Sequence, residues 1–133
     1  MDNLKIYCMC LESNYLDAVK KLNYIPVGLK NKNFSDDWLL DNTLVNISKK
    51  NPYYGEYTFY YWYWKNKLIK KKKEDWVGFC SYRELWGNQS RISDKTSIKS
   101  LLQNLPSEWS GYDSVIGEPF ILKKPGLGKI LKY

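Results

Sequence analysis

Short apolar runs and helical periodicities alternate along the first part of this chain. Leu4–Leu11, Tyr24–Gly28 and Asp75–Tyr82 are short and rich in apolar residues, which is typical of strands buried on both faces of a parallel sheet. Between the first two runs, the apolar residues from Tyr15 to Leu22 follow helical spacing. The pattern therefore predicts a β-α-β unit at the start of the chain.

An aromatic block occupies the middle of the chain. Nine of the twelve residues from Tyr53 to Trp64 are aromatic, and aromatic residues favour strands by propensity. Asn51-Pro52, however, is a helix-start signal, because asparagine can accept a hydrogen bond from the first turn and proline there loses no needed donor. We therefore predict a helix from Pro52 to about Leu68. It would be apolar nearly all round and covered on more than one side, with one stripe formed by Tyr57, Tyr60, Tyr61, Trp64 and Leu68.

The remaining segments complete an alternating order. Residues 30–50 are polar and without a clear period, as in a long functional or disordered loop. Apolar residues from Ile98 to Leu105 follow helical spacing until Pro106, and Tyr112–Leu122 predicts a further strand. The order β-α-β-loop-α-β-α-β predicts an α/β fold, a mostly parallel sheet with helices on both faces.

The amino-acid composition excludes several kinds of catalytic and metal site. Histidine is absent from the 133 residues, which excludes Ser-His-Asp, Cys-His and histidine-metal sites within this chain. The three cysteines, Cys8, Cys10 and Cys80, are odd in number and lack the C-x-x-C spacing of redox and zinc sites. We therefore expect reduced thiols in a cytoplasmic protein of one domain, with neither a secretory leader nor a membrane span.

The charge balance allows a partner other than a small molecule. Lysine and arginine number 21 against 14 acidic residues, a net charge of +7. Lysines beside aromatics are typical of nucleic-acid binding, because lysines meet phosphates and rings stack on bases. A run such as Lys70–Lys73 is, however, usually a solvated face. A basic nucleic-acid-binding module is one alternative, and a non-catalytic scaffold that self-associates or binds a partner through exposed aromatics is another.

The end of the third apolar run carries the most informative polar residues. Ligands of open α/β sheets bind beyond the carboxyl ends of the strands, where Ser81, Tyr82, Arg83 and Glu84 follow one another. Arginine can bind a diphosphate through two parallel hydrogen bonds, and a neighbouring carboxylate can orient it or a sugar hydroxyl. The alternative is a plain surface ion pair between Arg83 and Glu84. No P-loop or G-x-G-x-x-G is present.

Three strings carry a resemblance to a known family. NISKKNPYYGEYTFYYWYWKN (Asn46–Asn66), DWVGFCSYRELW (Asp75–Trp86) and EWSGYDSVIGEP (Glu108–Pro119) resemble the N-terminal half of the DUF4422 family, glycosyltransferase-like proteins of capsular and exopolysaccharide loci. The first string is similar to the family's block D-N-I-S-x-x-N-P-Y-Y-x-E-x-T-x-x-Y-W-x-W-K-N. The resemblance implies a Rossmann-like, GT-A-type transferase that moves a sugar from a nucleoside-diphosphate donor to a polysaccharide or glycan acceptor.

The strand-end position and the resemblance together give an expected donor site. The candidate set is Asn51, Tyr54, Glu56, Ser81, Tyr82, Arg83 and Glu84, with possible loop contacts from Asp41, Asn42 and Asn46. A plain helix cap is the alternative for Asn51, whereas a carboxylate among aromatics at Glu56 needs a partner. No catalytic residue is assigned.

Departures from the family pattern shape the expected chemistry. Ser81 stands where the family has histidine, and Glu84 where it has a second arginine. Many GT-A enzymes place a D-x-D at this strand end to bind a divalent metal; here Ser81-Tyr82-Arg83 occupies it, so we expect Arg83 to replace the metal's charge, with a divalent metal as the alternative. The family's domain continues past the equivalent of Tyr133, so this chain could bind a donor without turning it over.

Overall fold

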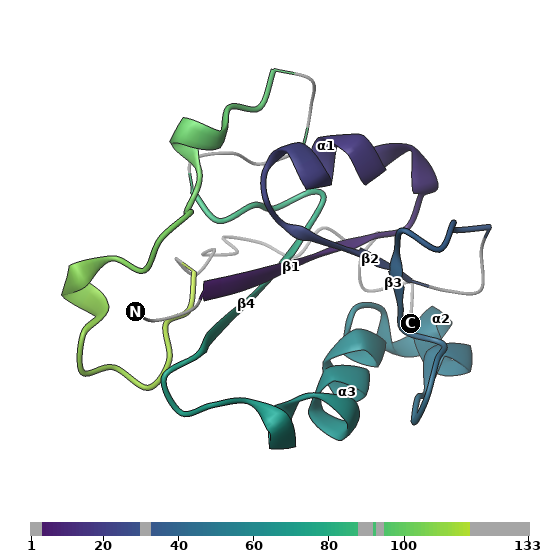
Figure 1. Ribbon diagram of the computed structural model, residues 1–133. Coiled ribbons are helices and arrows are strands. Elements are labelled where there is room, and N and C mark those ends of the chain that lie inside the picture. Colours follow the sequence, from purple (N-terminus) through teal and green to yellow (C-terminus); the bar gives the residue numbers. More distant parts are fainter. Residues whose placement is uncertain (1–3, 30–32, 88–91, 93–94, 118–133) are drawn as a thin grey trace, which may run out of the picture.

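A four-stranded parallel sheet forms the centre of the molecule (Figure 1). The computed structural model describes residues 4–29, 33–87, 92 and 95–117. Within them the strand order is β3-β2-β1-β4 and each neighbouring pair is parallel. The predicted α/β fold is therefore confirmed. The strands are β1 (Leu4–Cys10), β2 (Ile25–Gly28), β3 (Leu39–Leu40) and β4 (Trp76–Ser81).

The three apolar runs predicted as strands are strands in the structure. β1 lies between β2 and β4, with Tyr7 opposite Ile25 on one side and Phe79 on the other. Five successive residues of β1, from Ile6 to Cys10, are buried. This continuous burial requires cover on both faces of the sheet, and the run of apolar residues without alternation reflects it.

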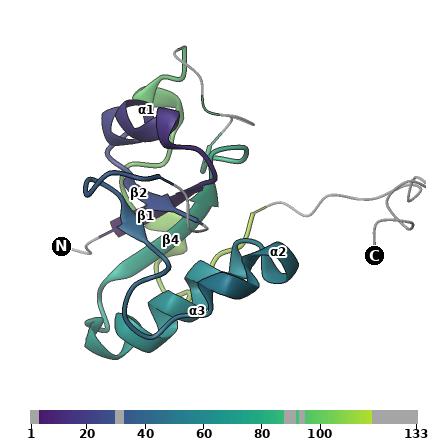
Figure 2. The same cartoon turned by 90° about the vertical axis from the view of Figure 1, so that its right-hand side faces the viewer.

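Helices supply that cover from both sides. α1 (Leu16–Lys21) covers one face, and α2 (Asn51–Tyr54) and α3 (Tyr57–Asn66) cover the other, as the two perpendicular views show (Figure 1, Figure 2). The predicted first helix is confirmed from Leu16 onward, whereas Ser13–Tyr15 forms a separate 3-10 turn. The prediction of helices on both faces is confirmed.

The predicted helix from Pro52 to Leu68 is wrong in one respect, because it is broken at Gly55. α2 ends where Gly55 adopts φ +55° and ψ −130°, a backbone conformation that a side chain disfavours and glycine accepts. α3 then begins at Tyr57 and ends at Asn66. The single helix expected from the aromatic block is therefore two helices with a bend that changes the direction of the chain.

The buried side of α3 also differs from the predicted stripe. Thr58, Phe59, Trp62 and Tyr63 are its buried residues, and they pack against Tyr7 of β1 and its neighbours on that face of the sheet. The predicted stripe lies largely on the opposite side of the helix, where Tyr57 is 68% and Trp64 52% exposed. The expectation of cover on more than one side is wrong for the described part of the chain.

The long polar segment contains the short edge strand β3. Residues 39 and 40 pair with Val27 and Gly28 of β2, so the segment predicted as a loop contributes to the sheet. Gly28 is required there, because a Cβ atom would lie 2.8 Å from the Phe34 ring and 3.0 Å from Leu40. Asp41 follows β3 directly, and its backbone N–H donates to the Gly28 carbonyl at 3.4 Å.

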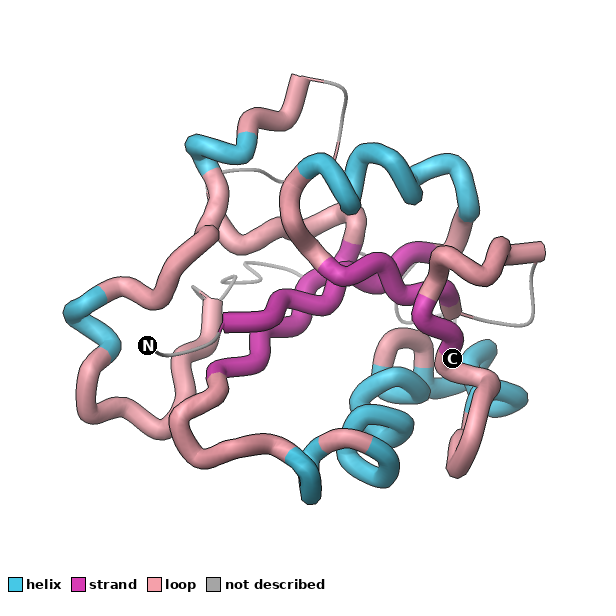
Figure 3. Tube along the Cα trace, in the orientation of Figure 1, coloured by secondary structure: helices cyan, strands magenta, loops and turns pink. Residues whose placement is uncertain are grey.

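The two elements predicted after β4 are not formed as expected (Figure 3). Only Ile98–Ser100 is helical, as a 3-10 turn, and Leu101 then forms an antiparallel bridge with Gly87. Leu101 is 7% exposed, so extended backbone buries what a helix was expected to bury. The predicted strand Tyr112–Leu122 is wrong over 112–117, which contain no strand, and its residues 118–122 lie outside the described residues.

The helices of the described residues are short. None is long and apolar enough to cross a membrane.

Candidate functional site

The carboxyl end of β4 folds into a tight turn. Ser81 and Glu84 form an antiparallel bridge, in which the Ser81 N–H donates to the Glu84 carbonyl at 3.2 Å and the Glu84 N–H donates back at 3.1 Å. The Arg83 N–H donates to the Ser81 hydroxyl oxygen at 3.3 Å. Ser81 is buried, whereas Arg83 and Glu84 are exposed. The turn therefore fixes the backbone and leaves the two charged side chains at the surface.

Tyr82 holds this turn against the neighbouring layers. Its N–H donates to the Met9 carbonyl of β1 at 3.1 Å, and its carbonyl accepts from the Ile92 N–H at 2.8 Å. Its ring stacks on that of Tyr15, with centroids 4.9 Å apart. The Arg83 guanidinium carbon lies 5.7 Å from the centre of the Tyr82 ring, a cation-π distance that limits its freedom.

A buried polar network joins the end of β3 to the two helices. The Thr58 hydroxyl donates to Asp41 Oδ2 at 2.5 Å, and Asn51 Nδ2 donates to the Thr58 oxygen at 3.1 Å. Asp41 and Thr58 are fully buried and Asn51 is 2% exposed. Buried polar groups of this kind are stable only when they are hydrogen-bonded to each other. The network therefore fixes the helix bend relative to the sheet.

Asn51 does not cap the helix in the way its sequence context predicts. It is the first residue of α2, and its side-chain amide donates across the bend to the Gly55 carbonyl at 2.8 Å. Its Oδ1 is buried and has no hydrogen-bond partner among the described residues. The plain N-cap is therefore wrong, and Asn51 instead closes the bend that Gly55 opens.

Glu56 connects this bend with the turn after β4. It lies between Gly55 and α3 and is half-buried. Burial raises the pKa of its carboxyl group; the nearby Arg83 charge opposes the shift, and Glu84 and Cys8 add to it. The structure thus places three predicted site residues, Glu56, Arg83 and Glu84, within electrostatic range of one another.

The other predicted residues lie outside this group. Both ends of the Asn46 side-chain amide are used within its own loop, with Nδ2 donating to the Thr43 and Leu44 carbonyls and Oδ1 accepting from Ser48. Tyr54 is 52% exposed on α2, and Asn42 is half-buried beside Asp41. The structure therefore gives Asn46 a role in its loop.

The three cysteines lie inside the sheet, on the α1 side. Cys8 of β1 is opposite Cys80 of β4, and Cys10 lies on the same face. All three are free thiols and buried. Hydrogen bonding to Cys8, together with burial, raises the pKa of Cys10 and of Cys80. They contribute to the packing of the cluster on the α1 side of the sheet.

In the described ranges no three histidine, cysteine, aspartate or glutamate side chains converge where they could hold a metal ion.

Sequence reasoning missed two residues that position the site. Thr58 bridges Asp41 and Asn51, and Tyr15 supports Tyr82 by stacking. A small hydroxyl residue inside an aromatic helix was a usable signal for Thr58, since such a residue offers a hydrogen bond rather than packing volume. No comparable signal pointed to Tyr15, because its partner is 67 residues away in the sequence.

The fold defines the class of this protein. Its all-parallel sheet with helices on both faces is that of a Rossmann-like α/β protein, with the polar groups just described gathered where the strands end. The chain belongs to the family described as Domain of unknown function (DUF4422), whose sequence profile matches residues 5–127. The family named from the sequence is thereby confirmed. No curated protein and no solved structure matches the chain.

Proposed function

We propose that this protein is a glycosyltransferase-like domain that binds a nucleoside-diphosphate sugar at the carboxyl edge of its sheet. The observation that carries the proposal is Arg83, held beside Tyr82 at the end of β4 and within electrostatic range of Glu56. An exposed arginine beside a parallel strand end suits a diphosphate, which its planar group can bind through two hydrogen bonds.

The residues around Arg83 take separate parts in this proposal. Arg83 binds the diphosphate and neutralises the charge that it gains when the sugar leaves. Glu56, whose pKa is raised by burial, accepts a hydrogen bond from a hydroxyl of the sugar or the ribose. The buried amide of Asn51 and its hydrogen-bond partners hold the bend that presents Glu56. In the proposed reaction the bond between the sugar and the diphosphate oxygen breaks, and the sugar is bonded instead to the oxygen of an acceptor hydroxyl on a glycan. The nucleoside diphosphate is the leaving group.

Nucleotide binding is the first test. Thermal unfolding of the chain is measured with UDP, GDP and CDP, each with and without manganese. A diphosphate at about one hundred times its dissociation constant adds roughly 2.7 kcal/mol to the free energy of unfolding. If one nucleotide raises the unfolding midpoint and the others do not, that nucleotide identifies the donor base. If the shift requires manganese, a metal ion and not Arg83 neutralises the charge of the diphosphate.

Arg83→Ala tests the residue that carries the proposal. We expect it to weaken diphosphate binding about tenfold to a hundredfold, the effect of losing a charge-assisted pair of hydrogen bonds. Arg83→Lys keeps the charge but not the paired hydrogen bonds, so its affinity should lie between those of the natural chain and Arg83→Ala. Lys99 is an exposed cation elsewhere on the surface, and Lys99→Ala should leave the affinity unchanged. Binding by Arg83→Ala with unaltered affinity contradicts the proposal.

Turnover is tested separately from binding. The chain is incubated with the nucleotide sugar whose base it binds, and release of the nucleoside diphosphate is followed with and without glycan acceptors. Binding without release identifies a donor-binding domain that lacks activity of its own. Release that depends on both an acceptor and Arg83 supports the transferase.

A further inference from the structure

The side of α3 that faces away from the sheet carries an unusual surface. Tyr57, Tyr61 and Trp64 follow one another at intervals of four and three residues, so that they share one face of the helix. Leu68 and Ile69 follow directly after the helix and are 45% and 89% exposed. These five residues are called the outer patch below.

The loop tip at Val45 is fastened to the other side of α3. Asn66 accepts from the Val45 N–H at 3.4 Å and donates to the Val45 carbonyl at 2.9 Å. Asn66 lies four residues after the buried Trp62, so Val45 is not part of the outer patch. The outer patch is therefore formed by α3 and the residues that follow it, and exposed apolar side chains gathered in this way are typical of an interaction surface.

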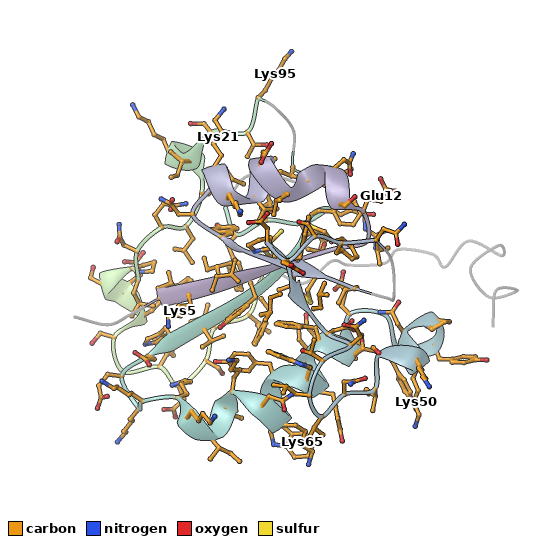
Figure 4. The ribbon with its side chains drawn as sticks, turned by 45° about the vertical axis from the view of Figure 1, so that its right-hand side comes forward. Lys5, Glu12, Lys21, Lys50, Lys65 and Lys95 are labelled. Carbon is orange, nitrogen blue, oxygen red and sulfur yellow. The ribbon has the colours of Figure 1, made fainter. Side chains whose placement is uncertain are left out.

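Lysines surround the outer patch. Residues 65–73 contain six lysines and no acidic residue. The Lys65 ammonium lies 3.7 Å from the centre of the Trp64 ring. Lys65 and Lys50 point away from the sheet on the α2–α3 side, whereas Lys21 and Lys95 lie on the opposite side of the molecule (Figure 4). The apolar patch therefore lies within a strongly positive field.

We propose that the outer patch docks this protein onto an anionic phospholipid bilayer. Tyrosine and tryptophan prefer the boundary between lipid headgroups and acyl chains, where one end of the ring is apolar and the other wet. Exposed leucine and isoleucine gain free energy by entering that boundary, and lysines are attracted to anionic headgroups. The outer patch and the lysines around it together supply all three kinds of residue. This inference does not depend on the proposed sugar transfer.

Two other occupants fit the patch less well. A nucleic acid offers stacking surfaces, but Lys65 covers the face of Trp64, and the ring of Tyr61 meets that of Trp64 edge-on at 85°. Ile69 and Leu68 would also stay in water against a phosphate backbone. A second copy of the chain carries the same net charge of +7, and repulsion between the two copies would oppose their association.

The direction of α3 makes the docked orientation compatible with an open site. α3 begins beside the carboxyl edge of the sheet and runs back toward the start of β4 (Figure 1). The lysines after α3 therefore lie toward the amino end of the sheet, and the turn at Arg83 lies toward the other end. A bilayer bound at the outer patch leaves the carboxyl edge facing the aqueous phase.

Vesicle binding tests the proposal with a matched pair of variants. Sedimentation is measured with vesicles of phosphatidylcholine alone and of phosphatidylcholine mixed with phosphatidylglycerol. We expect binding to the anionic vesicles only. The triple variant Lys70→Gln, Lys72→Gln, Lys73→Gln lowers the partition coefficient about a hundredfold, because each lysine near an anionic surface contributes about fivefold. The variant Lys21→Gln, Lys95→Gln, Lys99→Gln loses the same charge from exposed positions elsewhere and changes it by less than about threefold.

Apolar insertion is tested by Ile69→Ser and Leu68→Ser, each expected to lower vesicle binding about tenfold. Equal losses in the two lysine triples overturn the proposal, since net charge alone would then explain the binding. Unchanged vesicle binding by Ile69→Ser also overturns the proposal.

Two other outcomes identify a different occupant. If a single-stranded RNA competes for the outer patch and the Ile69→Ser variant binds that RNA normally, the patch is a nucleic-acid surface. Concentration-dependent dimers, abolished by Ile69→Ser and found without vesicle binding, identify a second copy. Circular dichroism of each variant excludes misfolding as the cause.

Discussion

The two faces of the sheet differ in how much of their cover is aromatic. On the α3 face, Tyr7, Phe59, Tyr63 and Phe79 meet ring to ring, mostly tilted or edge-on. On the α1 face, aromatic residues are mixed with smaller buried groups, among them Val19 and the thiols of β1 and β4. Aromatic pairs have preferred geometries, whereas aliphatic groups and thiols pack without direction. The α3 face is therefore the one on which position is specified most strictly.

Polar groups follow the same division. The α3 face also holds the hydrogen bonds of Thr58 and the bond from Trp62 Nε1 to the Thr43 carbonyl at 2.9 Å. These bonds tie the layer to the loop after β3 and to the bend that carries Glu56. Glu56 is therefore attached to the rigidly specified face, where small displacements of a charged group are resisted, whereas Arg83 follows Tyr82, which packs on Tyr15 in the α1-side cluster.

Replacing one buried residue in each layer gives the largest expected difference. Phe59→Ala removes a fully buried ring and is expected to lower the free energy of unfolding by about 4 kcal/mol. Val19→Ala on the other face removes a smaller buried group and is expected to cost about 2 kcal/mol. Urea unfolding followed by circular dichroism measures both. Phe59→Leu should fall between them, and equal losses for all three would show that ring geometry contributes nothing.

The buried hydroxyl of Thr58 provides a smaller and more specific effect. Thr58→Val keeps the shape but removes the donor to Asp41, leaving a fully buried carboxylate with one hydrogen bond fewer. We expect a loss of about 2 kcal/mol. Thr58→Ser retains the hydroxyl and is expected to lose less than about 1 kcal/mol. The reverse order in urea unfolding would show that the methyl group, and not the hydrogen bond, is what the site requires.

The pH dependence of stability gives the smallest effect and reports on Glu56 directly. Burial raises its pKa in the folded state, so between the unfolded and folded values the native state binds more protons than the unfolded one. The contribution of Glu56 to the free energy of unfolding is fully present below its pKa in the unfolded state. It is lost as the pH rises through its pKa in the folded state. Glu56→Gln should therefore gain stability relative to the natural chain between about pH 4 and pH 7.

The control for this pH dependence is Glu12→Gln, which removes an exposed carboxylate near the end of β1. Its unfolding midpoint should follow that of the natural chain at each pH, because an exposed group is hydrated in both states. A constant difference between Glu56→Gln and the natural chain at every pH would contradict the buried position of Glu56.

The sequence predicted the first half of the fold better than the second, for physical reasons. β1, β2 and β4 lie in a sheet that is covered on both faces, so their apolar runs could be recognised as strands without knowing which elements pack against them. The aromatic block was harder, because its outer and inner faces are equally apolar and only burial separates Phe59 from Trp64. The leucines near Ile98 have helical spacing, but contacts with distant residues hold them extended, among them Tyr24, whose hydroxyl donates to the Leu102 carbonyl at 3.1 Å.

The candidate site was predictable where its residues are adjacent in the sequence, and not where the fold brings distant residues together. Ser81, Tyr82, Arg83 and Glu84 are adjacent in sequence and directly follow a strand. The approach of Glu56 to Arg83, by contrast, depends on the bend at Gly55 and on the amide of Asn51, which the sequence suggested as an ordinary cap. Gly55 itself was the available clue, since a glycine within a helical pattern often marks an end.

The central position of β1 also determines how the chain can fold. β1 pairs with β2 after a short connection through α1, but with β4 only after a stretch of chain about four times longer, which costs roughly 1.2 kcal/mol more in loop-closure entropy. We therefore expect the β1–α1–β2 unit to form early and to offer the unpaired edge of β1 as a template. Docking of β4 at that edge is then the step that we expect to limit the rate of folding, and it is the same strand that brings Arg83 to the site.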